Sequence, residues 1–452
     1  MMREPAFRQL PRPSPTPLVG RRVLVLGLGD TGLSLARWVE REGGKVRVAD
    51  SRRDPPRKKD FAGELHAGAF CEASLDDVDV VCVSPGLSLE EEIIRQAIVK
   101  SIPVLGDVEI FAWHARQPVL AVTGTNGKST VTALAGHLLR CAEVDCEVAG
   151  NIGPPVLQAF EKRLVCGKLP EAWVLELSSY QLETTWSLAP RAATVLNLSE
   201  DHLDRYRDIE EYAAAKARIF QEGGAQVLNR DDARSLAMAQ SGQEVITFGL
   251  DVPPGGKDFG IAAGKLVQGR NEILPLDELA IGGSHNVANA LAACALVSIL
   301  KVPRQALGAG LKTFRGLPHR LQLVATRRGV QWYDDSKGTN VGAAVAALRG
   351  LGRKAVLILG GEGKGQDFSP LREPVRQFAS QVLLIGRDAP LIAKVVRGEN
   401  CSSLEEAVER AAQIAKPGEA VLLSPACASF DMFRDYRHRG EVFAQAVQRL
   451  GP

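Results

Sequence analysis

VLAVTGTNGKST, residues 119–130, decides the fold of the middle of this 452-residue chain. The apolar run 119–122 leads into a glycine loop, and the helix-like stretch 131–140 follows. Gly-Lys-Ser between a buried strand and a helix is a strong sign of triphosphate binding, because backbone N–H groups cradle phosphates and the lysine neutralises their oxygens. The usual pattern has glycine where Val122 stands, so we expect a shortened loop. A glycine turn with an exposed lysine is the plainer alternative.

Short apolar runs alternate with helix-length segments along the rest of the chain. Runs rich in Val, Ile and Leu without alternation are typical of parallel strands buried on both faces. We expect strands at residues 22–26, 45–48, 78–83, 119–122, 173–177, 193–198, 355–359, 382–385 and 420–423. Strands that alternate with helices predict an α/β protein built from open, mostly parallel sheets flanked by helices.

Breaks near residues 111–118 and 316–318 divide the chain into three domains, in keeping with about 150 residues per domain. A flexible Pro-rich tail is expected over 1–19. A Rossmann-like N-terminal domain follows at 20–113. An ATP-binding, P-loop-type central domain is expected at 114–316, and a Rossmann-like C-terminal domain at 317–452. The glycine-rich stretch 249–276 predicts short strands and turns that decorate the central domain.

Composition argues against several classes of partner. Lys and Arg number 55 and Asp and Glu 53, and this balance lacks the cationic excess that drives nucleic-acid binding. The chain has no apolar run of about 18 residues, so no membrane insertion is expected. The eight cysteines form no CxxC pair, which favours reduced, mostly buried thiols in a cytoplasmic protein. Cys427 has no evident base beside it and is interpreted as one of these buried thiols.

A second glycine loop, GLGDTG at residues 27–32, also joins a predicted strand to a predicted helix. With Asp50 after the next strand, G-x-G-x-x-G favours a dinucleotide such as NAD, or another diphosphate-bearing nucleotide, at the helix N-terminus. Any tight turn between a strand and a helix also favours glycines, so this signal is weaker than that of residues 123–130.

Further polar residues follow predicted strands. Glu176 could serve a phosphate-bound Mg²⁺, whereas His202 on its own is more often a structural residue. The pair Asp208 and Glu211 resembles a capping box for a helix at 209–220, where the spacing alone gives Lys216 only the role of a solvated residue. Three polar loops, at 333–340, 359–367 and 424–431, predict one shared pocket for a small carboxylate or phosphate.

Several of these stretches resemble the Mur ligase family of peptidoglycan synthesis. They are TGTNGKST (123–130), LELSSYQLE (175–183), NLSEDHLDR (197–205), SHNVANA (284–290), GLPHR (316–320), DDSKGTN (334–340) and SPACASFDMFRDYRHRGEVF (424–443). TGTNGKST is shared with folylpolyglutamate synthetase and cyanophycin synthetase. The last stretch, with GLGDTG and VSPG (83–86), looks like the family member that joins D-glutamate to UDP-N-acetylmuramoyl-L-alanine.

The resemblance implies an ADP-forming amide ligase that works through an acyl phosphate, with ATP, two Mg²⁺ and a carbamylated Lys216. It implies catalytic roles for Lys128, Lys216 and His202. It implies ATP contacts at Gly124, Thr125, Asn126, Gly127, Lys128, Ser129, Thr130, Asn286, Asn289, Arg320 and Asp335. It implies metal contacts at Ser129, Glu176, His202 and Lys216. It implies contacts to the UDP substrate at Gly29, Asp30, Thr31, Asp50, Ser51, Ser84 and Asn151, and to D-glutamate at Thr339, Lys364, Ser429, Phe430 and Tyr436.

The expected partners are therefore the small molecules UDP-N-acetylmuramoyl-L-alanine, D-glutamate and ATP, bound by a cytoplasmic monomer. The residues alone leave three other hypotheses about the function open. The first is an NAD-dependent oxidoreductase, which leaves residues 123–130 unexplained. The second is a nucleotide-binding module without enzymatic activity. The third is a sister ligase for another amino acid, or a folate glutamyl ligase.

Overall fold

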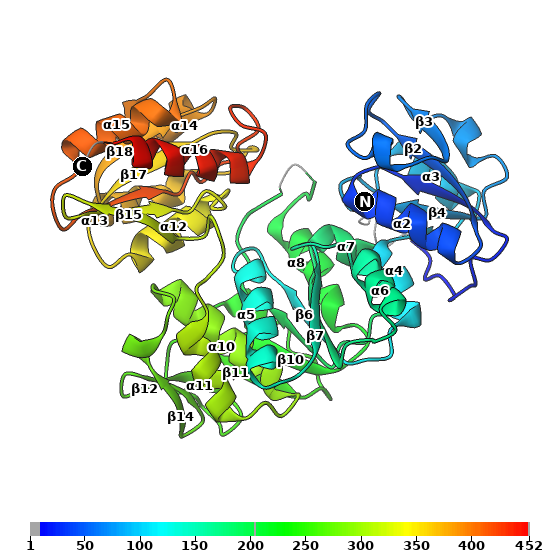
Figure 1. Ribbon diagram of the computed structural model, residues 1–452, viewed down its shortest axis with the longest axis horizontal. Coiled ribbons are helices and arrows are strands. Elements are labelled where there is room, and N and C mark those ends of the chain that lie inside the picture. Colours follow the sequence, from blue (N-terminus) through cyan, green and yellow to red (C-terminus); the bar gives the residue numbers. More distant parts are fainter. Residues whose placement is uncertain (1–9, 203–204, 451–452) are drawn as a thin grey trace.

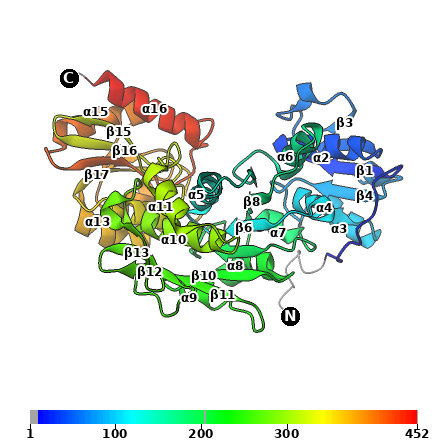
Figure 2. The ribbon, with the colours of Figure 1, turned by 60° about the horizontal axis from the view of Figure 1, so that its bottom comes forward.

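The computed structural model describes residues 10–202 and 205–450, and these form three α/β bodies in chain order. The bodies built around residues 20–106 and 320–450 lie on either side of the middle one (Figure 1). The turned view in Figure 2 shows the same order in space, with the middle body between the other two. The α/β class with three mostly parallel sheets, predicted from the sequence, is confirmed.

The first sheet is fully parallel, with strand order β3-β2-β1-β4-β5. Its strands are β1 (Arg22–Leu26), β2 (Lys45–Asp50), β3 (Glu64–Ala67), β4 (Val80–Val83) and β5 (Val104–Leu105), and its helices are α2 (Asp30–Arg41) and α3 (Glu92–Val99). The next helix, α4 (Asp107–His114), packs on the middle body. Gly32 in α2 lies so close to β1 that a Cβ there would sit 1.7 Å from the Gly27 oxygen. Only glycine therefore lets this helix approach the strand end.

The middle sheet has nine strands in the order β14-β13-β12-β11-β10-β9-β6-β8-β7. It comprises β6 (Val119–Thr123), β7 (Cys146–Gly150), β8 (Ala172–Glu176), β9 (Ala192–Val195), β10 (Ala225–Asn229), β11 (Val245–Phe248), β12 (Phe259–Ala262), β13 (Lys265–Gln268) and β14 (Asn271–Pro275). The helices are α5 (Lys128–Cys141), α6 (Val156–Val165), α7 (Ser179–Glu183), α8 (Ile209–Ala217), α9 (Ala233–Leu236), α10 (Ser284–Ser298) and α11 (Arg304–Thr313). Only the edge formed by β12, β13 and β14 is antiparallel. These strands are the short strands predicted for the glycine-rich stretch 249–276.

The third sheet runs in the order β15-β16-β20-β17-β18-β19, and β15 alone is antiparallel to its neighbour. Its strands are β15 (Gln322–Arg327), β16 (Val330–Asp334), β17 (Ala355–Gly360), β18 (Ala379–Ile385), β19 (Glu399–Asn400) and β20 (Ala420–Leu423). Its helices are α12 (Val341–Gly350), α13 (Arg372–Phe378), α14 (Ala389–Ala393), α15 (Leu404–Ile414) and α16 (Tyr436–Arg449). The sheet lies between two hydrophobic clusters of its own.

The first and middle bodies share one hydrophobic core. Trp38 of α2 packs on Phe160 of α6 with ring centroids 5.4 Å apart, and Phe111 of α4 packs edge-on against Trp173 of β8 at 5.1 Å. Aromatic pairs in these geometries add to the free energy of burying their area. The two bodies are therefore joined by apolar packing.

The N-terminal segment differs from the free tail expected over residues 1–19. Residues 1–9 lie outside the described part, but Leu10 and Leu18 are buried in the core that the first two bodies share. Arg12 is ion-paired with Glu222 at 2.9 Å. Across residues 10–202 and 205–450, no helix is both long and apolar enough to cross a bilayer.

Candidate active site

The phosphate-binding loop predicted from VLAVTGTNGKST joins the end of β6 to the start of α5. Gly127 has a φ of +83°, and a Cβ there would lie 2.4 Å from Asn289 Oδ1, so the loop needs glycine at this position. Lys128 turns back across the loop, and its Nζ donates to the carbonyl oxygens of Gly124 at 2.9 Å and Thr125 at 2.8 Å. Burial lowers the pKa of Lys128, and an anionic ligand would offset that penalty.

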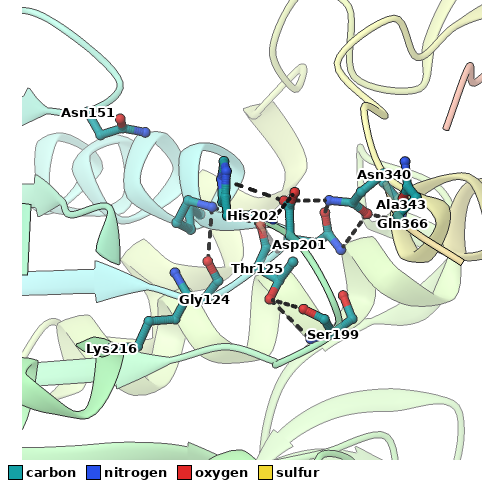
Figure 3. A network of polar contacts seen from close by, with 12 residues as sticks. Gly124, Thr125, Asn151, Ser199, Asp201, His202, Lys216, Asn340, Ala343 and Gln366 are labelled. Atoms are coloured by element: carbon teal, nitrogen blue, oxygen red, sulfur yellow. Dashed lines mark hydrogen bonds and ion pairs between the residues drawn. The ribbon is translucent and has the colours of Figure 1, made fainter. Parts of the chain in front are cut away.

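A polar cavity of about 250 Å³ lies beside this loop and is lined by residues of both the middle and the third body. From the middle body it is lined by the loop residues 125–129 and by Asn151, Glu176, Ser178, Ser179, Tyr180, Asp201, His202, Tyr212 and Lys216. From the third body it is lined by Arg320, Lys337, Thr339, Asn340 and Lys364, so that basic side chains outnumber the two acidic ones. Figure 3 shows Lys216 and His202 on either side of the loop, with Asn340 approaching from α12. Such an excess of cations suits a ligand that carries several negative charges.

Lys216 is buried, which corrects the solvated position that its spacing suggested. Its Nζ lies 4.5 Å from the centre of the Tyr212 ring and 3.4 Å from Thr123 Oγ1. Burial, and then repulsion by Lys128, lowers the pKa of Lys216 well below its usual value. The lowered pKa of Lys216 favours the neutral amine, which is the nucleophilic form of a lysine.

The helix that carries Lys216 begins as the sequence predicts. Asp208 caps α8 by accepting a hydrogen bond from the Glu211 N–H at 2.8 Å. The reciprocal half of the expected capping box differs, because the Glu211 carboxylate accepts from the Arg207 N–H instead, at 3.0 Å. The α-helix ends at Ala217, and residues 218–220 continue it as a 3₁₀ turn.

Glu176 fits a metal ion bound together with phosphate. Its Oε2 is buried without a hydrogen-bond partner, while Oε1 accepts from Asn151 Nδ2 at 2.6 Å. The described residues contain no group of three or more His, Cys, Asp or Glu side chains arranged to hold a metal. Mg²⁺ is usually held by one or two carboxylates with phosphate oxygens and water, so one unpartnered carboxylate beside a phosphate loop suits it.

The two other predicted metal contacts are engaged with protein groups. Ser129 Oγ accepts a hydrogen bond from Arg320 Nη2 at 2.6 Å. His202 lies edge-on to the Tyr180 ring, and burial lowers the pKa of its imidazole, which favours the neutral, ligating form.

A second cavity, of about 310 Å³, also borders the phosphate loop. Asn126, Gly127 and Arg320 line both cavities, and the second adds the predicted ATP contacts Thr130, Asn286, Asn289 and Asp335. Asp335 accepts hydrogen bonds from Ser424 Oγ at 2.6 Å and from the Leu321 N–H at 3.1 Å. Burial raises the pKa of Asp335 to about 7. The two cavities share Arg320, which lies where the middle body connects to the third.

The predicted contacts for the UDP substrate fall in two places. Gly29, Asp30, Thr31, Asp50, Ser51 and Ser84 lie where β1, β2 and β4 end, whereas Asn151 follows β7 and lines the cavity beside the phosphate loop. Ser84 Oγ donates to the Gly27 oxygen at 3.0 Å. The buried Asp50 carboxylate accepts from the Leu28 N–H at 2.7 Å and is ion-paired with Arg52 at 2.7 Å. Asp50 therefore shapes the glycine loop.

The predicted D-glutamate contacts are only partly brought together. Thr339 and Lys364 line the cavity beside the phosphate loop. Phe430 and Tyr436 line neither this cavity nor the one of about 310 Å³, and Phe430 is 68% exposed. The Tyr436 ring instead lies 4.1 Å from Lys337 Nζ. Ser429 is buried. Burial raises the pKa of the Cys427 thiol to about 12, in agreement with its interpretation as an unreactive thiol.

Two polar groups escaped the sequence reasoning. Asn340 hydrogen-bonds with Asn126 and Asp201 across the boundary between the middle and third bodies. Arg205 is ion-paired with the buried Glu183 at 2.7 Å and also donates to the Pro85 oxygen, at 3.2 Å, in the first body. Asn340 is the Asn of DDSKGTN and Arg205 is the Arg of NLSEDHLDR, but nothing in the spacing of either residue pointed to its partner.

Comparison with known families covers most of the chain. Residues 122–297 match the family described as Mur ligase middle domain. Residues 21–106 match the Mur ligase MurD-like N-terminal domain, and residues 319–427 match the Mur ligase glutamate ligase domain. Mur ligases use ATP and Mg²⁺ in amide ligation during peptidoglycan precursor synthesis.

Individual relatives agree over nearly the full length. The chain is 53% identical to the UDP-N-acetylmuramoylalanine–D-glutamate ligase of Thiobacillus denitrificans, over 96% of this chain and 97% of the relative. It is 51% identical to the protein of the same name from Methylobacillus flagellatus, over 96% and 98%.

Solved structures share the fold at low identity. A pseudomurein peptide ligase type C from Methanothermus fervidus is 18% identical, with a TM-score of 0.61 over 96% of this chain and 100% of that one. The UDP-N-acetylmuramate-alanine ligase MurC from Thermotoga maritima is also 18% identical, with a TM-score of 0.59 over 95% and 99%. By its matched domains and its relatives at about half identity, this chain belongs to the Mur ligase family.

Proposed function

We propose that this chain is an ATP-dependent ligase that adds D-glutamate to UDP-N-acetylmuramoyl-L-alanine and releases ADP and phosphate. The single observation that carries the proposal is the cavity where the phosphate loop meets Lys364 and Thr339 of the third body. An activated carboxylate formed beside the loop would face the pocket that supplies the amine. The names of the relatives that are about 50% identical support the choice of substrates.

The first step activates the carboxylate. An oxygen of the terminal carboxylate of UDP-N-acetylmuramoyl-L-alanine attacks the γ-phosphorus of ATP, the bond from that phosphorus to the β–γ bridging oxygen breaks, and ADP leaves. The protein contributes position and charge, because phosphoryl transfer requires little covalent help from side chains. Lys128 is already folded against the loop and would move onto the β and γ oxygens, and Arg320 lies within reach of the same loop through Ser129.

The second step forms the amide. The neutral amine of D-glutamate attacks the acyl carbon, the nitrogen gives up one proton, and the tetrahedral intermediate collapses to the amide as the bond from carbon to the phosphate oxygen breaks and phosphate leaves. Lys364 and Thr339 would bind the carboxylates of the amino acid, and Ser429, Phe430 and Tyr436 would complete that pocket after a local rearrangement. Closely apposed bodies exclude water, which would otherwise hydrolyse the acyl phosphate.

Bound Mg²⁺ would neutralise charge on the transferring phosphoryl group. We expect Ser129, Glu176, His202 and Lys216 to hold two such ions with the phosphates. Lys216 would do so as a carbamate: its neutral amine attacks CO₂, a C–N bond forms, and one proton is released. The lowered pKa of Lys216 supports this modification, and the unpartnered Glu176 Oε2 supports a cation nearby.

The other readings fit the geometry less well. An NAD site would use Asp50 on a ribose, but this carboxylate is held by the Leu28 N–H and Arg52. A module that only binds nucleotide leaves the cationic groups of the third body without a role. We further infer that the chain acts in the cytoplasm as a monomer, with domain boundaries near 20–113, 114–316 and 317–452.

An amino-acid panel tests the proposal. The purified protein is given ATP, Mg²⁺ and UDP-N-acetylmuramoyl-L-alanine with one amino acid at a time, and phosphate release and product mass are measured. Release should require D-glutamate. Incorporation of L-lysine or diaminopimelate in its place would overturn the substrate assignment, and release that needs neither the nucleotide precursor nor an amino acid would overturn the ligase reaction.

A further inference from the structure

We propose that Asn340 is a positioning residue that sets the amino-acid pocket of the third body against the phosphate loop, through the side chains of Asn126 and Asp201. Figure 3 shows Asn340 and Asp201 joined across the boundary between the two bodies. The inference rests on the proposed function, because it concerns how an amine reaches a carboxylate activated beside that loop.

The Asn340 side chain uses its whole hydrogen-bonding capacity. Its Nδ2 donates to Asn126 Oδ1 and to Asp201 Oδ2, both at 3.1 Å. Its Oδ1 accepts from Asn126 Nδ2 at 3.3 Å and from the Ala343 N–H at 2.8 Å. An amide has two donors and room for two acceptor bonds, so this buried group is fully paired. One side chain thus caps α12 and joins the third body to two loops of the middle body.

Both partners are themselves held in place. The Asn126 backbone is clasped by the Asn197 side chain, with its N–H donating to Asn197 Oδ1 at 2.9 Å and its oxygen accepting from Asn197 Nδ2 at 3.1 Å. Asp201 Oδ1 accepts from the His202 N–H at 3.0 Å. The Asn126 side chain therefore reaches Asn340 from a fixed backbone, which makes the contact selective for one placement of α12.

Gln366 connects the start of α12 to the proposed amino-acid pocket through hydrogen bonds. Its Oε1 accepts from the Val341 N–H at 2.9 Å, and its Nε2 donates to the Ala426 oxygen at 2.8 Å. The start of α12, the loop that bears Lys364 and the loop after β20 are thereby tied together. A change in the contact of Asn340 with Asn126 would move Lys364 relative to the phosphate loop.

The variant Asn340→Ser separates this role from helix capping. Serine is a good N-cap residue, so α12 should keep its cap, but its hydroxyl is too short to span Asn126 and Asp201. Asn340→Asp keeps the length and the cap but turns an acceptor toward the Asp201 carboxylate, which repels it. The control is Ser403→Ala, which removes the cap of α15, where Ser403 Oγ accepts from the Glu406 N–H.

Kinetics give the first measurement. Three hydrogen bonds between bodies, one of them to a carboxylate, predict a loss of kcat in Asn340→Ser of about 10- to 100-fold. The KM for D-glutamate should rise, while the KM for the nucleotide precursor stays within about twofold of that of the wild type, since its loops do not touch Asn340. The loss of kcat should be larger in Asn340→Asp than in Asn340→Ser. In a double-mutant cycle with Asn126→Ala, the losses should be clearly less than additive.

Small-angle X-ray scattering of the ligand-free protein gives the second measurement. Asn340→Ser should have a larger radius of gyration than the wild type, and Ser403→Ala should match the wild type in scattering and in kinetics. Wild-type kinetics and scattering in Asn340→Ser would overturn the inference, as would the same kinetic change in Ser403→Ala. If the wild type uses a different amino acid, the proposed substrate fails, but the kcat loss with that amino acid and the scattering still test Asn340.

Discussion

Replacing Arg205 with alanine should destabilise the middle body and loosen its contact with the first. The Arg205 guanidinium pairs with the Glu183 carboxylate at 2.7 Å, and only 12% and 4% of the two side chains are exposed. It also lies 3.9 Å from the centre of the Tyr180 ring. Without it, Glu183 keeps the Tyr206 hydroxyl, which donates at 2.6 Å, and the charge of Arg218.

The expected size follows from leaving a buried carboxylate without its cation. Breaking one side of a buried ion pair costs about 3–5 kcal/mol. For a body of roughly 200 residues this corresponds to a drop in Tm of about 6–20 °C in its transition. Burial already raises the pKa of Glu183, and Arg205 is the first of the groups that hold it down, so the variant should raise that pKa further. The loss of Tm should therefore shrink as the pH falls and Glu183 takes up a proton.

Differential scanning calorimetry at pH 5 and pH 8 measures both effects, and the double variant Arg205→Ala/Glu183→Gln is the matched control. Neutralising the orphaned carboxylate should restore part of the lost stability at pH 8. If the double variant is no more stable than Arg205→Ala alone, the ion pair is not what stabilises this site. Because Arg205 also donates to the Pro85 oxygen, the KM for the nucleotide precursor should rise in Arg205→Ala.

Three further changes have defined outcomes. Lys128→Ala should lower ATP-dependent phosphate release by about 100-fold or more with an unchanged circular dichroism spectrum, and undiminished turnover would contradict its role. Lys216→Ala should lose about 10- to 100-fold in activity and regain part of it with added acetate or formate, whereas full activity without them would refute the metal role. The pKa of Asp335 is raised to about 7, so the folded protein keeps a proton that the unfolded chain loses near pH 4. The stability of the fold should therefore fall as the pH rises from about 4 to about 7, and Asp335→Asn should flatten this part of the profile of Tm against pH.

Strand positions could be predicted closely where apolar runs are bounded by turn residues. The strands predicted at 22–26 and 420–423 coincide with β1 and β20. The prediction for 193–198 runs too far, because β9 ends at Val195 and Asn197 turns away from the sheet to bind the backbone of Asn126. The polar Asn197 within an apolar run indicated that the strand ends early, but its partner Asn126 lies 71 positions away and could not be predicted from the local pattern.

The phosphate loop was predictable because its chemistry is contained in consecutive residues. Lys216 was not predictable from its spacing, since its burial depends on Tyr212 and Thr123, and only the family resemblance pointed to it. Asn340 and Arg205 lay beyond both approaches, because each acts by joining two bodies whose relative placement no local pattern encodes.

The shared aromatic packing of Trp38, Phe111, Phe160 and Trp173 has a consequence for the order of events during turnover. Domains that share a dry interior cannot part without exposing it, so the first two thirds of the molecule should travel as one rigid cradle. The last third meets that cradle through amides, a guanidinium and a carboxylate and through the contact of α12 with α10, while its own hydrophobic clusters stay separate from the shared core. Loading of the nucleotide precursor can then precede arrival of the amine, with the final third swinging in as the moving part.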